Sequence, residues 1–303
     1  MIAVKAKEHG SQHYVPRTYL KPWCDPETPE RMEPYVWLFD RDGQGSRRKA
    51  PKNVFEETDF YTISMPNGER NLVLEHGLQE LEDQLAKVRD EKLRQDLPVT
   101  ADEGAYVVAF MIAMSFRTKA HRHRRRQEWS RVALSMEKAQ KRKDEHGRSP
   151  TVRFSFSQNP HGPSLSLAEV QKLADESMQH MLPVEISTYL PLVAGMDMMV
   201  MRTDDPIGFI TSDDPCIWLN ERANAGPPVM RDLGVFGILM PLSPQQMLFL
   251  NPLQSCYGRL KALGQVDELN RMTRVHANSE IVVCRNTVRR EWFEDEASRF
   301  ASA

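Results

Sequence analysis

"TADEGAYVVAFMIAMSFR", residues 100–117, predicts a helix at the centre of the fold. Thr100 and Glu103 have the spacing of a capping box, in which each side chain accepts a hydrogen bond from the other residue's backbone N–H. Nearly every residue from Ala105 to Phe116 is apolar, and a helix that is apolar on all sides is buried. The run is shorter than the roughly 20 residues of a membrane span. We therefore expect a core helix and no membrane association.

Further helices flank this core helix. Leucines at three- and four-residue spacing between about Asn71 and Leu97 predict a long helix before it. After Phe116 the sequence becomes strongly basic, "RTKAHRHRRRQEW", and we expect the core helix to continue through it to about Lys143. A second capping box, Ser166 with Glu169, marks the start of another helix.

Strand-forming sequence dominates after residue 195. Five short apolar runs, "MMVMRT", "IGFIT", "CIWL", "FGILMPL" and "QMLFLNP", are separated by loops rich in Pro, Gly and Asn. Nearer the N-terminus, "YVWLFD" and "SRRKAP" are typical of a hairpin. Helices grouped before strands indicate an α+β fold. We predict one domain, 1–303, with a central long-helix region at about 70–195. A C-terminal mixed or antiparallel sheet with short helices follows at about 196–285.

Composition excludes several classes of protein. With 303 residues, 40% hydrophobic and 27% charged, the chain has the composition of a globular protein rather than a disordered one. The first residues show no apolar stretch followed by a cleavage site, so we expect a cytoplasmic location. No GxGxxG after a strand, GxxxxGK[ST], GxSxG or HExxH is present. Nucleotide cofactors and serine-hydrolase chemistry therefore lack sequence support.

Charge is unevenly distributed along the chain. Residues 117–148 contain twelve Lys or Arg against four Asp or Glu, a local net charge of +8, and since the whole chain carries −2, the remainder carries −10. Four arginines concentrate this charge: Arg122, Arg124, Arg125 and Arg126. The segment is typical either of a solvated helix end or of a surface that binds nucleic acid or another anion through phosphate groups.

Two acidic turns flank one short apolar run in "TDDPIGFITSDDP", residues 203–215. If Ile207–Thr211 is a strand, Asp205 and Asp213 lie about 25 Å apart and cannot form one carboxylate pair. We interpret the first turn as a local backbone turn. Ser212 and Asp213 follow the most apolar part of the run, so the second is interpreted either as a turn or as part of a functional site.

Several motifs occur in a fixed order: "QHYVPRTYLKPW", "NVFEETDFYT", "LEHGLQELE", "MSFRT", "FITSDDP" and "MPLSP", followed by a late Asn-containing helix. Together they resemble a bacterial family catalogued as domain of unknown function 4238, from His13 to about Val283. The resemblance implies no reaction. The family usually has a proline after the Arg-Thr pair, and because Lys119 departs from that, we infer no helix break there. The motif positions are His13, Pro16, Tyr19, Glu75, Glu82, Arg117, Thr211, Ser212, Asp213 and Pro215.

Arg117 continues the apolar stripe of its helix and therefore needs a partner. Glu75 and Glu82 lie seven residues apart on one edge of the neighbouring helix, where either can face it. This pattern predicts an interhelical salt bridge or an arginine aimed at an anionic ligand. His13 is either structural or a proton-transfer group. His13, Glu75, Glu82 and Asp213 together could be ligands of a divalent metal ion. The cofactor is therefore unknown, with a divalent metal as one option.

Two functions remain open. The first is an intracellular bacterial hydrolase or nuclease-like effector acting on a phosphate-containing substrate. Its site would contain His13, Arg117 and Asp213, with Ser212 beside Asp213 and with Glu75 and Glu82 as acid, base or metal ligands. The second is a non-catalytic nucleic-acid-binding or interaction module that uses the basic helix 117–148. The enzyme hypothesis requires that His13, Arg117 and Asp213 converge in one solvent-connected pocket.

Overall fold

The predicted core helix is α3, Ala101–Phe116, in the computed structural model of the chain, which describes residues 10–65, 67–147, 151–155, 162–220, 235–251 and 266–294. Both hydrogen bonds of the Thr100–Glu103 capping box are present. Most of the helix is sealed from solvent on all sides, because α2, α6 and a sheet surround it. Its buried residues are Val107, Val108, Phe110, Met111, Ile112, Ala113, Met114, Ser115 and Phe116.

Six further α-helices and four short 3-10 turns lie in the described part of the chain. The helices are α1 (Arg17–Leu20), α2 (Val73–Glu91), α4 (Lys119–Glu145), α5 (Leu167–Asp175), α6 (Ser177–Val193) and α8 (Val266–His276). The 3-10 turns are η1 (Lys21–Trp23), η2 (Pro51–Asn53), η3 (Leu93–Gln95) and η6 (Arg290–Trp292). The Ser166–Glu169 capping box starts α5 as predicted. No helix in these described segments is long and apolar enough to cross a membrane.

Two four-stranded sheets, both antiparallel, form the β part of the fold. One has the order β11-β12-β13-β9, with β9 (Asp197–Arg202), β11 (Ile217–Asn220), β12 (Val235–Ser243) and β13 (Gln246–Asn251). The other has the order β10-β14-β2-β3, with β2 (Val36–Asp40), β3 (Arg47–Lys49), β10 (Thr211–Ser212) and β14 (Glu280–Val283). The predicted N-terminal hairpin is the β2–β3 pair. Three two-stranded pairs are β1 (Ser11–His13) with β4 (Glu56–Thr58), β5 (Ile63–Ser64) with β6 (Arg70–Asn71), and β7 (Phe154–Ser155) with β8 (Ser164–Leu165).

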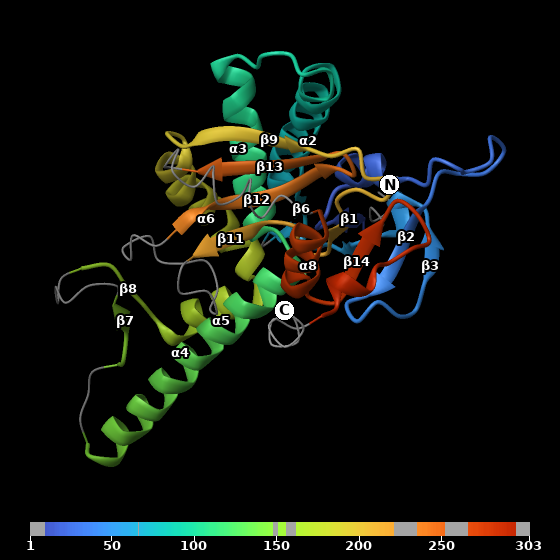
Figure 1. Cartoon of the computed structure of the whole chain (residues 1–303). Coiled ribbons are helices and arrows are strands. Elements are labelled where there is room, and N and C mark those ends of the chain that lie inside the picture. The colour runs from blue at the N-terminus through green and yellow to red at the C-terminus, as the bar shows by residue number, and fades with distance from the viewer. Residues whose placement is uncertain are drawn as a thin grey trace, which may run out of the picture.

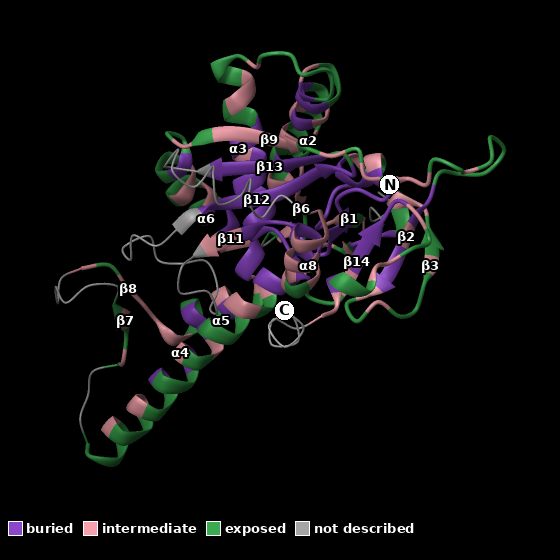
Figure 2. Cartoon of the chain, in the orientation of Figure 1, coloured by how far each residue is buried: buried purple, intermediate pink, exposed green. Residues whose placement is uncertain are grey.

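The β12–β13 hairpin separates two apolar layers, since successive side chains of a strand point to opposite faces. On one face, Leu248 and Leu250 pack into the main core with α3. On the other, Met247 and Phe249 pack against Leu269 of α8. Figure 2 shows both strands in purple at the centre of the molecule, and Figure 1 shows α8 in front of the sheets with α4 extending away beside α5. The α+β prediction is confirmed, and the C-terminal sheet is antiparallel.

The expected continuous helix from residue 101 to about Lys143 is wrong, because the chain breaks between α3 and α4. Thr118 leaves helical geometry, with φ −79° and ψ 158°, and its hydroxyl caps the new helix by accepting from the His121 N–H. The same hydroxyl donates to Asp214, from the loop after β10. A threonine at an N-cap with a distant carboxylate partner favours a break over an uninterrupted helix.

The predicted strand Ile207–Thr211 is also mostly wrong, because only Thr211 and Ser212 pair in a sheet, as β10. Gly208 has φ +71°, and a Cβ there would lie 1.9 Å from the Pro244 carbonyl oxygen, so this close approach needs glycine. The side chain of Asn270 replaces strand partners: it accepts from the Ile210 N–H and donates to the Gly208 carbonyl. The family's late asparagine thus holds an irregular segment in place.

Candidate functional site

Arg117 lies in the core, at the junction of α3 and α4, and is 3% exposed. Its Nη1 donates to Glu82 of α2 at 2.8 Å, which confirms the predicted interhelical salt bridge. Its Nη2 donates to the His13 backbone carbonyl at 2.8 Å, and its Nε donates to the Tyr61 hydroxyl at 3.1 Å. Although burial acts against the charge, Tyr61 and Glu82 raise the pKa of Arg117 above its ordinary value. The guanidinium therefore stays charged and joins α2, β1 and α3.

His13 and Glu75 also contact protein groups. The His13 imidazole Nε2 lies 3.1 Å from the Lys52 carbonyl oxygen. The imidazole of His13 therefore contacts Lys52, whereas the backbone carbonyl of His13 accepts from Arg117. Glu75 accepts from the Gln12 amide at 2.6 Å, next to the bond between Gln12 and Thr62. The structure thus joins Arg117 to Glu82 and to the backbone carbonyl of His13 in one network. Glu75 is connected to this network through Gln12, the residue before His13.

Asp213 belongs to a separate set of contacts. Its carboxylate accepts from the N–H groups of Asn278 and Ser279 at 2.9 Å each and from the Ser279 hydroxyl at 2.5 Å. These bonds fasten the turn between α8 and β14. Burial raises the pKa of Asp213 despite them. Ser212 is fully buried, and its hydroxyl accepts from the Asp214 N–H. Within the described residues, no hydrogen bond or ion pair joins the Asp213 carboxylate to Arg117 or to the His13 imidazole. Arg117 and Asp213 are both buried, so the structure of these residues does not show the solvent-connected pocket that the enzyme hypothesis required of His13, Arg117 and Asp213, and an enzyme site would have to be built from other residues.

In the described segments, no group of three or more His, Cys, Asp or Glu side chains is arranged to hold a metal ion, so these segments give no support for a divalent-metal site. The four suggested ligands each contact a protein group instead. His13 meets a carbonyl, Glu75 an amide, Glu82 a guanidinium, and Asp213 two backbone N–H groups and a hydroxyl.

Carboxylates surround the basic start of α4. Glu57 of β4 accepts hydrogen bonds from both Nη atoms of Arg122, at 2.7 and 2.9 Å. Glu185 of α6 receives Arg125 Nε at 2.5 Å and the imidazole of buried His121 at 2.9 Å. Arg126 is exposed, and its one ion pair with a described residue is a distant 3.9 Å contact with Asp175. Arg148, the last residue of the predicted basic segment, lies outside the described residues. Much of the positive charge is therefore matched by local carboxylates.

Arg124 differs from Arg122 and Arg125. Its guanidinium faces the buried carboxylate of Asp214, with Nη1 3.5 Å from Oδ2, but makes no hydrogen bond to any described residue. Its Nε is sealed from solvent and has no hydrogen-bond partner in the part of the chain that the structure describes. An unpaired buried donor is costly and therefore unusual in a folded protein. Arg124 is thus an arginine whose hydrogen-bonding capacity is unfilled although it faces a carboxylate.

His276, the last residue of α8, approaches the same oxygen. Its Nε2 lies 3.7 Å from Asp214 Oδ2, and its side chain is 32% exposed, whereas Asp214 is 3% exposed and Arg124 40%. The other carboxylate oxygen, Oδ1, accepts from the Thr118 hydroxyl at 3.1 Å. A guanidinium and an imidazole, both partly exposed, therefore face one buried carboxylate from distant parts of the sequence, without closing on it.

This cluster, Asp214, Arg124, His276 and Thr118, is called the Asp214 site below. It can bind an anion at the open donors of Arg124, and it can transfer protons through an imidazole that lies beside a carboxylate. Sequence analysis named only Arg124 of the four. Thr118 and Asp214 stand directly beside Arg117 and Asp213 in "MSFRT" and "FITSDDP", so both lie inside motifs noted in the sequence. No sequence signal singled out His276.

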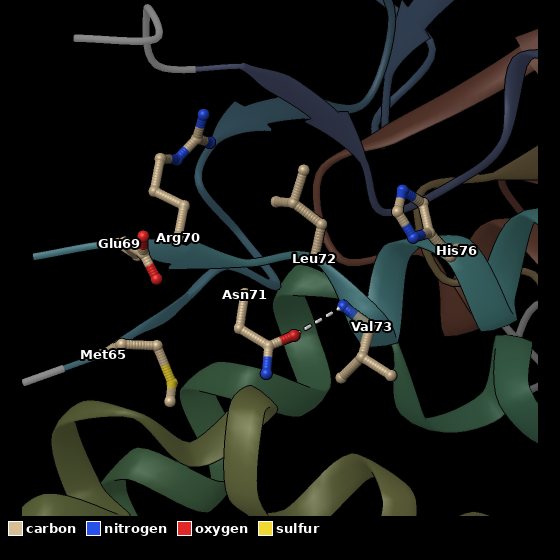
Figure 3. Close-up of a pocket in the computed structure, with 7 residues that line it drawn as sticks. All are labelled: Met65, Glu69, Arg70, Asn71, Leu72, Val73 and His76. Carbon is tan, nitrogen blue, oxygen red and sulfur yellow. Dashed lines mark hydrogen bonds between the residues drawn. The ribbon is translucent and has the colours of Figure 1, made fainter. Parts of the chain in front are cut away.

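A hollow of about 460 Å³ lies elsewhere, at the β5–β6 hairpin and the start of α2. Figure 3 shows seven residues that line it, Met65, Glu69, Arg70, Asn71, Leu72, Val73 and His76, with the Asn71 side chain accepting from the Val73 N–H. None of them belongs to the Asp214 site. Two of its polar groups already have protein partners, since Asn71 accepts from the Val73 N–H and Arg70 pairs with Asp59. We therefore assign no function to this hollow.

Comparison with protein families decides the relationship of the chain. The model of the family described as "Protein of unknown function (DUF4238)" matches residues 11–287. The chain belongs to this family. The match confirms the resemblance noted from the ordered motifs. The region shared with the DUF4238 family includes Arg117, Thr118, Asp213 and Asp214. No curated protein and no solved structure matches the chain.

Proposed function

We propose that the chain is a cytoplasmic bacterial hydrolase or nuclease-like enzyme that acts on a phosphate-containing substrate at the Asp214 site. One observation carries this proposal: Arg124 and His276, both half-exposed, face the same buried carboxylate oxygen at 3.5 and 3.7 Å, and Arg124 makes no hydrogen bond within the described segments. A planar guanidinium with open donors matches the oxygens of a phosphoryl group.

The roles follow from the geometry. Arg124 binds the phosphoryl oxygens and offsets the charge that develops on them. His276 accepts a proton from the attacking water as a general base while the water oxygen bonds to phosphorus and the ester P–O bond breaks; the imidazolium then returns the proton to the leaving alcohol oxygen. Asp214 orients the imidazole and stabilises its protonated form, while the Thr118 hydroxyl holds the second carboxylate oxygen. In this proposal His13, Arg117 and Asp213 support the fold around the site.

The alternative, a nucleic-acid-binding module on the basic helix 117–148, has less support. Arg122 and Arg125 are held by Glu57 and Glu185 through close hydrogen bonds, which leaves fewer free cations for a phosphate backbone. Arg126 remains exposed, and among the described residues its ion pair is a distant contact with Asp175. This arginine therefore provides a matched control, because it carries the same charge on the same helix, two residues from Arg124.

The test compares four variants of the full chain in the hydrolysis of a phosphodiester and a phosphomonoester of p-nitrophenol. We expect His276→Gln, Asp214→Asn and Arg124→Gln each to lower kcat/KM by roughly 100-fold or more, as general acid–base and electrostatic catalysis imply. Arg126→Gln should stay within about twofold, since an exposed ion pair contributes little. Ester hydrolysis that is equal in wild type and His276→Gln, or absent from the wild type, overturns the proposal.

A further inference from the structure

The helix that carries Arg124 has two different sides. On one side of α4, Trp129 and Met136 pack with Val170 of α5, so this side is buried. At about 3.6 residues per turn, Arg131 points roughly 200° away from Trp129, which places it on the opposite side. Figure 1 shows α4 extending away from the body of the protein, and Figure 2 shows much of its surface exposed. The side opposite α5 therefore faces solvent.

Four cationic side chains form a row on this exposed side, and the row begins at the Asp214 site. Arg124, Arg131 and Lys138 follow one another at seven-residue intervals, and Arg142 comes four residues later. Seven residues are close to two turns of an α-helix and four are close to one, so these side chains lie one above another. Arg131, Lys138 and Arg142 are exposed, and none of their side chains makes a hydrogen bond or an ion pair with a residue that the structure describes. We call Arg124, Arg131, Lys138 and Arg142 the cationic row.

Carboxylates of the same helix do little to offset this charge. Of the four in α4, three contact groups outside the row, namely Glu128 with Arg125, Glu137 with Gln171 and Asp144 with Gln140. The fourth, Glu145, is the last residue of the helix. Arg122 and Arg125, which Glu57 and Glu185 hold, lie on other sides of the helix, about 160° and 100° around it from Arg124. The cationic row is thus separate from the arginines that local carboxylates occupy.

We propose that the substrate of the Asp214 site is a nucleic-acid strand, whose sugar–phosphate backbone lies along the cationic row. This inference rests on the function proposed above and names its substrate class. Arg124 and Arg142 are 18 residues apart, which is about 27 Å at roughly 1.5 Å per residue. At about 3.4 Å per nucleotide of one strand, that length corresponds to about eight nucleotides. A small phosphate ester, in contrast, reaches Arg124 alone.

The chemistry of the row determines what it recognises. Guanidinium and ammonium groups bind phosphate oxygens, and contacts to the backbone carry no sequence information. The row has no aromatic side chain on which a base could stack, so we expect no base preference. One phosphodiester of the strand lies at Arg124. The oxygen of a water molecule bonds to its phosphorus, the bond from phosphorus to one sugar oxygen breaks, and the proton that His276 took from the water passes to that sugar oxygen.

Fluorescence anisotropy tests the row on the full chain, with labelled oligouridylate and oligothymidylate of about 12 nucleotides at about 50–200 mM salt. The row variant combines Arg131→Gln, Lys138→Gln and Arg142→Gln. We expect its affinity for the oligonucleotides to fall about tenfold or more. The slope of log affinity against log salt should fall by about two, because each phosphate contact on a single strand contributes about 0.7. The two probes differ in the 2′-hydroxyl, so their comparison identifies the sugar.

The matched control removes three positive charges from the same part of the protein, by Arg126→Gln, Arg153→Gln and Lys172→Gln. These side chains are exposed too, but each faces a carboxylate of α5 or of its C-cap, namely Asp175, Glu169 and Glu176. Oligonucleotide affinity should stay within about twofold of the wild type, because exposed ion pairs contribute little. The melting temperatures of both triple variants should stay close to that of the wild type, since surface substitutions rarely change stability.

The outcomes separate the two proposals. If the wild type hydrolyses the p-nitrophenyl esters but binds neither oligonucleotide, or if the row variant binds them as the wild type does, the substrate class is overturned and the Asp214 site stands. Binding by the row to phosphatidylserine vesicles, with no binding to either oligonucleotide, also overturns the substrate class. If the row binds oligonucleotides but neither they nor the esters are hydrolysed, both proposals are overturned. Affinity lost in the row variant alone, together with strand cleavage that His276→Gln abolishes, supports both.

Discussion

Replacing Glu82 by glutamine separates a structural role of Arg117 from a ligand-binding one. Arg117 is 3% exposed, and its three guanidinium nitrogens bind Glu82, the His13 carbonyl and the Tyr61 hydroxyl. Glutamine keeps a carbonyl oxygen at the position of the 2.8 Å bond and removes only the negative charge. The substitution therefore leaves a buried cation without its counter-ion and changes the packing very little.

The magnitude follows from the burial of the two partners. Breaking a buried ion pair by removing one partner costs about 3–5 kcal/mol. Because the Glu82 side chain is 16% exposed, water screens part of the remaining charge, and we expect the lower end, about 3 kcal/mol. An unfolding entropy of about 2.1 cal/mol/K per residue gives about 0.6 kcal/mol/K for the 303-residue chain. The melting temperature should therefore fall by about 5 °C.

Thermal and urea unfolding followed by circular dichroism measure this loss, and calorimetry with inorganic phosphate measures ligand binding. Glu75→Gln is the matched control, because Glu75 lies on the same edge of α2 but accepts from the neutral Gln12 amide. It should lose less than about 1 kcal/mol. If Glu82→Gln keeps the wild-type melting temperature but no longer binds phosphate, Arg117 is an anion clamp and our structural interpretation of it is refuted.

Two further predictions concern the segment around the first acidic turn. Gly208→Ala should lower the free energy of unfolding by at least about 2–4 kcal/mol in urea titrations, because its Cβ would lie 1.9 Å from the Pro244 carbonyl oxygen at a positive φ. Gly77→Ala, on an open helix surface, is the control and should raise the free energy of unfolding by about 0.5–1 kcal/mol. If Gly208→Ala destabilises the protein no more than Gly77→Ala does, the close approach at Gly208 is contradicted. Although partial burial acts the other way, hydrogen bonds from the Gly208 N–H and from Arg289 lower the pKa of Asp205. The stability that the Asp205 carboxylate contributes is therefore present above about pH 4 and is lost as the pH falls through the lower pKa of the folded state. The loss of unfolding free energy in Asp205→Asn should shrink below about pH 4, and a loss that stays constant with pH argues against this linkage.

The sequence predicted the elements whose signals are local. The α3 capping box, the α5 capping box and the β2–β3 hairpin depend on residues close together in the chain, and all are found. The errors came from long-range contacts. The break at Thr118 depends on Asp214, almost a hundred residues away, and the irregular Ile207–Ile210 segment depends on Asn270. The proline that the family usually has at position 119 was a usable signal, because proline suits the first turn of a helix.

The residues predicted for the site are neighbours in sequence of those in the Asp214 site, and the difference follows from what a buried core requires of charged side chains. Arg117 and Asp213 are the most conspicuous residues of their motifs, and both are buried, so their charges are taken up by partners that hold the fold. Their neighbours differ: the Thr118 hydroxyl donates to Asp214, and the other oxygen of Asp214 faces Arg124 of α4 and His276 of α8 without a hydrogen bond to either among the described residues. Loss of charge at Glu82 should therefore reduce stability first, whereas loss of charge at Arg124 should reduce ligand binding first. A protein in which both substitutions acted alike would have no separate site beside its buried network.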